Sequence, residues 1–170
     1  MRKDPVEPGR EAYVELKFSP SAELITTVRR FVSNFYQRIL KNGEASSRLA
    51  LATHELLENA VKFSMDGEST IRIGVQRAER AHLVTIRTRN RATREDIATL
   101  QDLVEETHSV EDHFQHYQTV MRRSTKDRDR SRLGLARICA EAQMSLACQI
   151  VGDDVCVVAS TQLDLEHGGP

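Results

Sequence analysis

The chain has 170 residues, a length that suits one ordinary domain with a substantial core of its own. Hydrophobic residues make up 39% and charged residues 29%, which indicates a globular rather than a disordered chain. The formal net charge is −1, so nothing in the overall balance favours binding to nucleic acid or to a membrane surface.

The sequence predicts a cytoplasmic protein. It contains no apolar run long enough to span a bilayer, and residues 1–5 are not followed by the apolar core of a signal peptide. Its three cysteines, Cys139, Cys148 and Cys156, lie in apolar stretches and form no CxxC pair. We therefore expect them to be buried, reduced thiols.

The first half of the chain predicts a strand, two helices and an antiparallel pair of strands. Apolar and polar residues alternate in the strands, and apolar residues recur at helical spacing between them. Asn42-Gly43 is expected to end the first helix. In chain order, these elements are placed at residues 12–18, 24–39, 45–63, 69–75 and 82–88.

The second half predicts a helix, an exposed charge-rich loop or lid, a short amphipathic helix and a closing hairpin. The loop is inferred from a run that is dense in charge and lacks apolar residues. In chain order, these segments are placed at residues 93–104, 121–130, 133–144, and 145–150 with 155–161.

Helices and strands come in clusters rather than in strict alternation. This order predicts an α/β two-layer sandwich, in which helices cover one face of a mixed, mostly antiparallel sheet. Residues 11–162 would form a single domain, between a flexible lead-in over residues 1–10 and a flexible tail over residues 163–170.

The second predicted helix contains the residues most indicative of function. Glu55 and Asn59 are four positions apart, so they share one helix face with the apolar Ala52, Leu56 and Phe63. A carboxylate and a carboxamide on an inward face cost free energy unless something binds them. A hydrated Mg²⁺ ion and a nucleotide phosphate would satisfy both groups. A helix with two polar residues satisfied by neighbours or water is the alternative.

This segment resembles the N box of the GHKL family of ATPases, Glu-x-x-x-Asn followed by a small residue and a basic-aromatic pair. The resemblance implies a Bergerat-type ATP-binding fold, with Asn59 as the Mg²⁺ ligand, Glu55 as the general base and Lys62 near the phosphates. Residues 131–138, Ser-Arg-Leu-Gly-Leu-Ala-Arg-Ile, resemble the later glycine-rich box of the family. There the backbone of Gly134 and Leu135 would hold phosphate at a helix start, with Arg132 beside it.

The adenine-binding box of the family, Asp-x-Gly-x-Gly, is effectively lost. Its best match is Asn90 in place of the Asp and Ala92 in place of the first Gly. An Asn oxygen can still accept a hydrogen bond from an amine, but Ala92 restricts positive φ.

The resemblance implies a regulator similar to anti-sigma-factor serine kinases, which act by partner switching. Such a protein would bind ATP and Mg²⁺, control a STAS-like antagonist or a sigma factor, and possess the capacity to form a homodimer. Two hypotheses follow. The chain is either an ATP-dependent serine/threonine kinase or ATPase, or a nucleotide-free pseudokinase that only binds a protein partner. Neither hypothesis involves nucleic acid or a membrane.

Three other patterns favour plain structural interpretations. His54-Glu55-x-x-Glu58 lacks the second histidine of a zinc protease. The histidines at 108, 113 and 116 are expected to lie on a solvated polar face rather than to share a metal. The charged run over residues 122–132 has no aromatic residue for base stacking and is expected to be a solvated loop.

Overall fold

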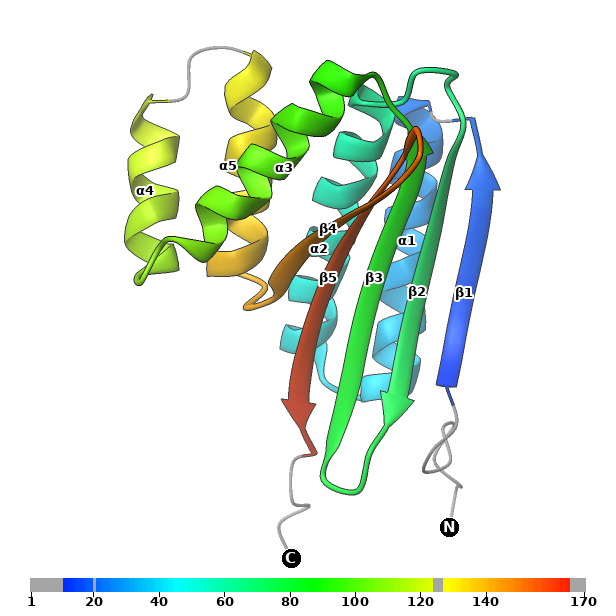
Figure 1. The fold of residues 1–170 in the computed structure, drawn as a ribbon. Coiled ribbons are helices and arrows are strands. Elements are labelled where there is room, and N and C mark those ends of the chain that lie inside the picture. The colour runs from blue at the N-terminus through cyan, green and yellow to red at the C-terminus, as the bar shows by residue number, and fades with distance from the viewer. Residues whose placement is uncertain (1–10, 20, 124–126, 166–170) are drawn as a thin grey trace, which may run out of the picture.

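The structure is a computed structural model that describes residues 11–19, 21–123 and 127–165. These residues form a strand, two helices, two strands, three helices and two strands (Figure 1). In chain order the elements are β1 (Glu11–Phe18), α1 (Ala22–Leu40), α2 (Gly43–Lys62), β2 (Ser69–Arg77), β3 (Ala81–Arg91), α3 (Arg94–His108), α4 (His113–Arg123), α5 (Asp127–Ala140), β4 (Ser145–Val151) and β5 (Asp154–Asp164).

The strands form one sheet in the order β1-β2-β3-β5-β4, and each neighbouring pair is antiparallel. Ile73 lies opposite Ile86, which in turn lies opposite Ala159, so apolar residues form a row across the three central strands. Side chains alternate between the two faces of each strand, and this register therefore directs one face of the sheet to the core.

Helices α1 and α2 lie behind the sheet in Figure 1, while α3, α4 and α5 gather beyond the β4 edge. The predicted two-layer α/β sandwich is confirmed. The core between the layers is closed by fully buried apolar side chains from both, which include Val32, Leu49, Leu56, Leu57, Ile73, Ile86 and Ala159. Removing this surface from water is the main term that favours folding.

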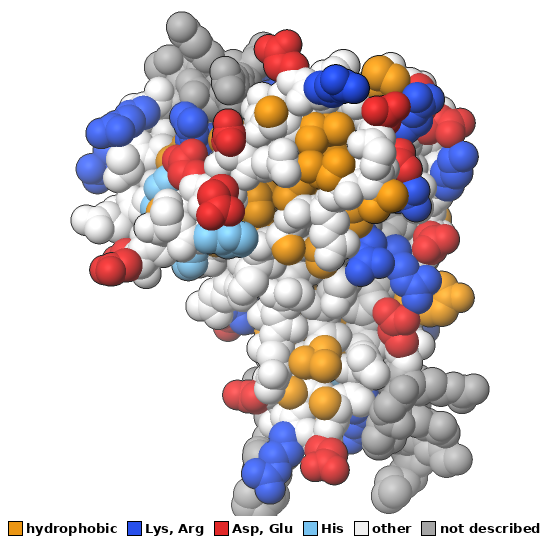
Figure 2. Space-filling model, in the orientation of Figure 1, with side chains coloured by type: hydrophobic (Ala, Val, Ile, Leu, Met, Phe, Trp, Pro, Cys, Tyr) orange, Lys and Arg blue, Asp and Glu red, His pale blue; other side chains and the backbone are white. Residues whose placement is uncertain are grey.

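No helix of the described residues covers the opposite face of the sheet (Figure 1), which Figure 2 shows in space-filling form. Arg72 stacks over the ring of Tyr13 at 3.9 Å and also pairs with Glu11 and Glu15, so β1 and β2 are linked by charge on this face. Tyr13 remains 56% exposed there. In Figure 2 apolar side chains gather in the upper middle of the view, and charged side chains lie mostly around its edges.

Local capping sets the boundary between α1 and α2 and corrects one prediction. Asn42-Gly43 does not end the first helix. Lys41 adopts the left-handed conformation after α1, and Asn42 is already the N-cap of α2, with Oδ1 accepting from the Ala45 N–H at 2.9 Å. The two-residue connection of Lys41 and Asn42 leaves no room for a separate loop, so Asn42 serves the following helix.

The charged run over residues 121–130 is not a single exposed loop. Helix α4 continues to Arg123 and α5 already begins at Asp127, while residues 124–126 lie outside the described part of the chain. The prediction failed because residues 127–130, with which α5 begins, are all charged, so the start of this helix has no apolar periodicity. At its other end α5 stops at Ala140, so Met144 lies beyond the helix rather than in it.

Both predicted flexible ends lie largely outside the described residues, which begin at 11 and end at 165. Strand β5 continues to Asp164, where Leu163 and Asp164 pair with His82 and Ala81 of β3. The first two residues of the predicted tail therefore belong to the sheet.

The cysteines only partly match the prediction of buried thiols. Cys139 is buried in the core, whereas Cys148 and Cys156 are half-buried, and all three are free thiols. Burial raises the pKa of each thiol, which keeps it in the unreactive protonated form. None of the helices in the described residues has the length and apolar character needed to cross a membrane.

Helix α3 begins with a reciprocal cap whose removal should be measurable. Thr93 Oγ1 accepts from the Asp96 N–H at 3.1 Å and donates to the Asp96 carboxylate at 2.8 Å. Thr93→Ala is expected to lower the free energy of unfolding by about 1 kcal/mol, because an N–H at the helix start loses its acceptor. Urea denaturation of Thr93→Ala and of the conservative Thr93→Ser tests this, and equal losses in both variants would contradict it.

Candidate functional site

Helix α2 presents Glu55 and Asn59 to α5 rather than to the sheet. Asn59 is 7% exposed and the side chain of Glu55 is 13% exposed, so both are removed from bulk solvent as their helical spacing predicted. The apolar side chains of Leu56 and Leu57 are fully buried on the same helix and anchor it in the core. The position of both polar groups is therefore fixed by the packing of α2.

A cavity of about 410 Å³ opens beside these two residues. It lies between α2 and the first half of α5, with one side chain from α1. Its lining residues are Ile25, Glu55, Glu58, Asn59, Val61, Lys62, Arg130 and Ser131. A larger cavity of about 510 Å³ lies near the start of α2, around Asn42 and Arg48, and contains none of the predicted site residues.

Asn59 carries an unsatisfied polar atom at this cavity. Its Nδ2 is excluded from solvent and has no hydrogen-bond partner among the described residues. A buried donor without a partner costs about 1–3 kcal/mol, and native structures contain few of them. The Asn59 amide therefore brings to this cavity a donor that no described group of the chain uses.

Lys62 brings a positive charge to the same cavity. Its Nζ donates to Ser131 Oγ at 3.1 Å and lies 5.4 Å from the centre of the Phe63 ring. Ser131 is 3% exposed and Lys62 is exposed, so this contact joins the last turn of α2 to α5 at the edge of the buried region. With Arg130, Lys62 gives the cavity two cations beside the amide of Asn59.

The carboxylate of Glu55 lies against α5. Oε1 is 3.3 Å from Nη1 of Arg137, and Arg137 is also held by Glu141 through Nε at 3.1 Å. Burial raises the pKa of Glu55, and the positive charge of Arg137 opposes that rise without cancelling it. A buried carboxyl with a raised pKa is a suitable proton acceptor.

The raised pKa of Glu55 predicts how the free energy of unfolding changes with pH. The native state holds a proton on Glu55 that the unfolded chain has already released, so stability from this group falls as the pH rises from about 4.5 through the native pKa. Glu55→Gln does not titrate, and its stability relative to the wild type should therefore increase from pH 4 to pH 8. Urea denaturation at both pH values tests this, with Glu79→Gln in the exposed β2–β3 turn as control. An advantage that shrinks with pH would contradict it.

Gly134 and Leu135 do not form a helix-start cradle, which corrects the sequence prediction. Helix α5 begins at Asp127, so Gly134 lies in its interior, where the backbone N–H groups are used by the helix itself. Leu135 is 1% exposed and belongs to the core. Gly134 instead faces Glu55: a Cβ atom at this position would lie 2.6 Å from Oε2. The glycine makes room for the carboxylate rather than for a phosphate.

Arg132 contacts Glu106 of α3 rather than the α2–α5 cavity. Its Nε donates to Glu106 of α3 at 2.9 Å, and it is not among the residues that line the cavity. The same Glu106 lies 3.7 Å from Nε2 of His116, so this cluster joins α3, α4 and α5. Arg132 therefore holds the three helices together, in place of the predicted role beside a phosphate.

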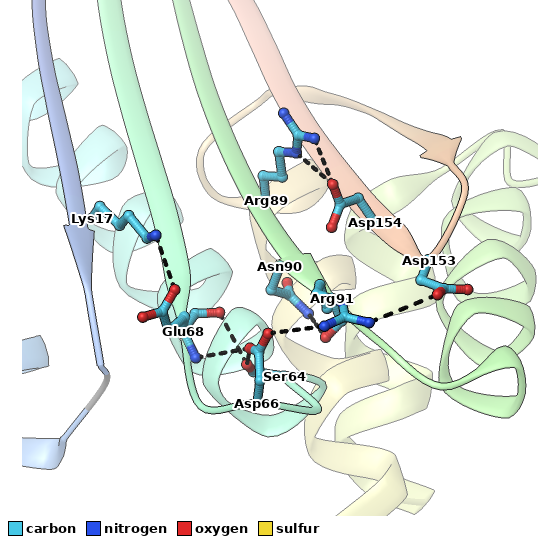
Figure 3. A network of polar contacts seen from close by, with 9 residues as sticks. All are labelled: Lys17, Ser64, Asp66, Glu68, Arg89, Asn90, Arg91, Asp153 and Asp154. Atoms are coloured by element: carbon cyan, nitrogen blue, oxygen red, sulfur yellow. Dashed lines mark hydrogen bonds and ion pairs between the residues drawn. The ribbon is translucent and has the colours of Figure 1, made fainter.

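Asn90 is also separated from the cavity. Its Nδ2 donates to the Phe63 carbonyl at 3.0 Å and to the Arg91 carbonyl at 3.2 Å, which ties the end of α2 to the end of β3. Around it lies a network of ion pairs in which Arg91 bridges Asp66 and Asp153 (Figure 3). These contacts give the amide a structural role at the strand ends.

The histidines do not form a metal site. Within the described residues, no three His, Cys, Asp or Glu side chains are placed to hold a metal ion. His108 Nε2 contacts the Leu146 carbonyl at 2.7 Å, and His54 lies 3.2 Å from Glu58.

Sequence reasoning missed Arg137 and Ser131 as parts of the site. Arg137 follows Gly134 by three positions, so the two share a face of α5, and this spacing was the available signal. Ser131 lies a further turn back on the same helix. Arg137 and Ser131 come close to Glu55 and Lys62 because α5 packs beside α2.

No family model matches the sequence, and no curated protein matches it. Among solved structures, a chain in the crystal structure of the SiaB–SiaC complex from Pseudomonas aeruginosa is similar to this chain, with a TM-score of 0.64. The match covers 88% of this chain and 89% of the other, at 12% sequence identity. This similarity shows that the two chains share a fold.

Proposed function

We propose that this chain is a bacterial signalling regulator, similar to an anti-sigma-factor serine kinase, that binds the phosphates of ATP with Mg²⁺ in the α2–α5 cavity and controls a protein partner. The observation that carries the proposal is the unsatisfied, buried amide of Asn59 on the wall of a cavity that also contains Lys62 and Arg130.

The residues of the cavity suit the phosphate end of such a ligand. Mg²⁺ prefers few protein oxygens and retains its waters, so the Asn59 side chain alone could supply the protein ligand. Lys62 and Arg130 would neutralise phosphate charge, which is the main contribution that proteins make to phosphoryl transfer. When bound, ATP and Mg²⁺ supply the transferable phosphoryl group.

Glu55 would accept the proton of an attacking hydroxyl or water. Its buried carboxyl and raised pKa suit that role. The chain's own contribution is thus a positioned base, a metal-binding amide and two cations on one cavity wall.

Asn90, the residue matched to the adenine-binding Asp of the family, does not line the α2–α5 cavity. Asn90 uses its amide N–H groups on backbone carbonyls and lines a separate cavity of about 280 Å³ among charged residues. This favours a second candidate, a nucleotide-free protein-binding module on the same fold. The absence of a helix-start cradle at Gly134 favours it as well.

A thermal shift measurement with ATP and Mg²⁺ distinguishes the two candidates. A ligand at a hundred times its Kd stabilises the native state by about 2.7 kcal/mol. We expect the shift to require Mg²⁺ and to disappear with EDTA. Absence of any shift up to millimolar ATP would remove the nucleotide-binding function and leave the protein-binding module.

The partner is proposed to be a STAS-like antagonist or a sigma factor. The structurally similar chain comes from a complex of two proteins, SiaB and SiaC, which supports a protein partner. Calorimetric titration with purified STAS-domain and sigma-factor products of neighbouring genes tests it, and phosphate transfer to the partner is measured in the same mixtures. Light scattering on the chain alone tests the homodimer that the sequence resemblance implies.

A further inference from the structure

Two residues of helix α5 lie against the carboxyl group of Glu55. Gly134 and Arg137 lie one turn apart on this helix, and both face the carboxyl group of Glu55 on α2. Arg137 Nη1 lies 3.3 Å from Oε1, and the missing side chain of Gly134 leaves space for Oε2. Each carboxyl oxygen of Glu55 is thus placed by a different residue of the same helix.

We propose that Gly134 and Arg137 form a carboxylate dock on α5, in which Arg137 acts as a positioning residue that holds Glu55 at the edge of the cavity. The inference rests on the proposed function, in which Glu55 is the base, and it identifies how that base is oriented.

The contacts of Arg137 suit a positioning role. Its guanidinium is held from both sides, by Glu55 through Nη1 and by Glu141 through Nε at 3.1 Å. Two anchors leave the planar guanidinium little freedom to rotate, so the carboxylate facing it is also fixed. Arg137 is not among the residues that line the cavity, so it acts on the site only through Glu55.

Helix α4 packs on α5 next to the dock. Burial and the charge of Glu141 raise the pKa of the Tyr117 hydroxyl on α4, and the charge of Arg137 lowers it.

Several titratable groups besides Arg137 affect the pKa of Glu55 or lie near its carboxyl group. Glu58 raises its pKa and His54 lowers it, both from α2. Tyr117 faces it from α4, and Lys62 and Arg130 line the same cavity. Arg137 is the largest of the influences that lower the pKa of Glu55, so its removal has a predictable sign.

The test follows the titration of the Glu55 carboxyl carbon by NMR in the full chain, which requires no nucleotide. In Arg137→Gln we expect the midpoint to move to higher pH than in the wild type. Arg137→Lys, which keeps the charge but not the planar guanidinium, should restore part of the difference. Arg38→Gln, at an exposed position of α1, is the control and should leave the midpoint unchanged. An unchanged midpoint in Arg137→Gln would overturn the dock.

A second readout separates positioning from a purely structural role. Where the wild type turns over ATP, the acidic limb of its pH–rate profile should move to higher pH in Arg137→Gln, with about a tenfold lower kcat at neutral pH and little change in KM. A rise in KM with an unchanged kcat and profile would also overturn the proposal. If the wild type binds no ATP, the proposed function fails, while the NMR titration still decides whether the dock exists.

Discussion

Asn59→Ala is expected to weaken ATP–Mg²⁺ binding about 10- to 150-fold and, at the same time, to stabilise the ligand-free protein. A hydrogen bond or coordination contact to a charged group contributes about 1.5–3 kcal/mol, which corresponds to this range of Kd. In the ligand-free protein the same amide has a buried Nδ2 without a partner. Removing it relieves a desolvation cost, and alanine is the better helix former.

The two effects have opposite signs, and this is what makes the substitution informative. A residue retained only for packing would lose stability when truncated, whereas a binding residue that is unsatisfied without its ligand should gain stability. Urea denaturation without ligand and calorimetric titration with ATP–Mg²⁺ measure the two effects separately. Asn34→Ala, an exposed asparagine on α1, controls for helix propensity.

A loss of stability in ligand-free Asn59→Ala would show that the amide is satisfied in solution, for example by a bound water. Undiminished Mg²⁺-dependent binding would remove Asn59 from its proposed role. Asn59→Asp keeps an oxygen ligand and adds a charge, so it should retain Mg²⁺ binding better than the alanine variant.

The fold was largely predictable from the sequence because most of its elements have a buried face. Strands β2, β3 and β5 alternate between core and solvent, and α1 and α2 repeat apolar residues along one side. Glu55 and Asn59 could be paired for the same reason, since four residues of helix bring them to one face.

The remaining parts depend on contacts between distant segments. Helix α4 packs by one deeply buried side chain and leaves Phe114 57% exposed, and α5 begins with four charged residues that give no apolar periodicity. Arg132 and Arg137 are five residues apart on α5, yet the first pairs with α3 and the second with α2. Local sequence does not determine which helix an arginine will meet. The resemblance to a glycine-rich box placed Arg132 beside a phosphate, whereas its Nε donates to Glu106 of α3.

Gly134→Ala is expected to lower any Glu55-dependent turnover about 100-fold with little change in stability. The new Cβ would lie 2.6 Å from Oε2 of Glu55, so the carboxylate must turn away from its present position. The displaced atom is at the end of a flexible side chain, and alanine favours the interior of a helix by about 1 kcal/mol over glycine. The cost of moving the carboxylate and the gain in helix propensity therefore nearly cancel in the free energy of unfolding.

Catalysis does not benefit from that compensation, because misplacing a reacting group by about 1 Å can reduce the rate about 100-fold. Gly43→Ala is the matched control, since a Cβ at that helical glycine would meet no atom within 4 Å. Turnover and urea denaturation of both variants give the comparison. If Gly134→Ala kept full turnover, Glu55 would not need its contact with α5 to act. A large loss of stability would show that the Glu55 carboxylate cannot move aside.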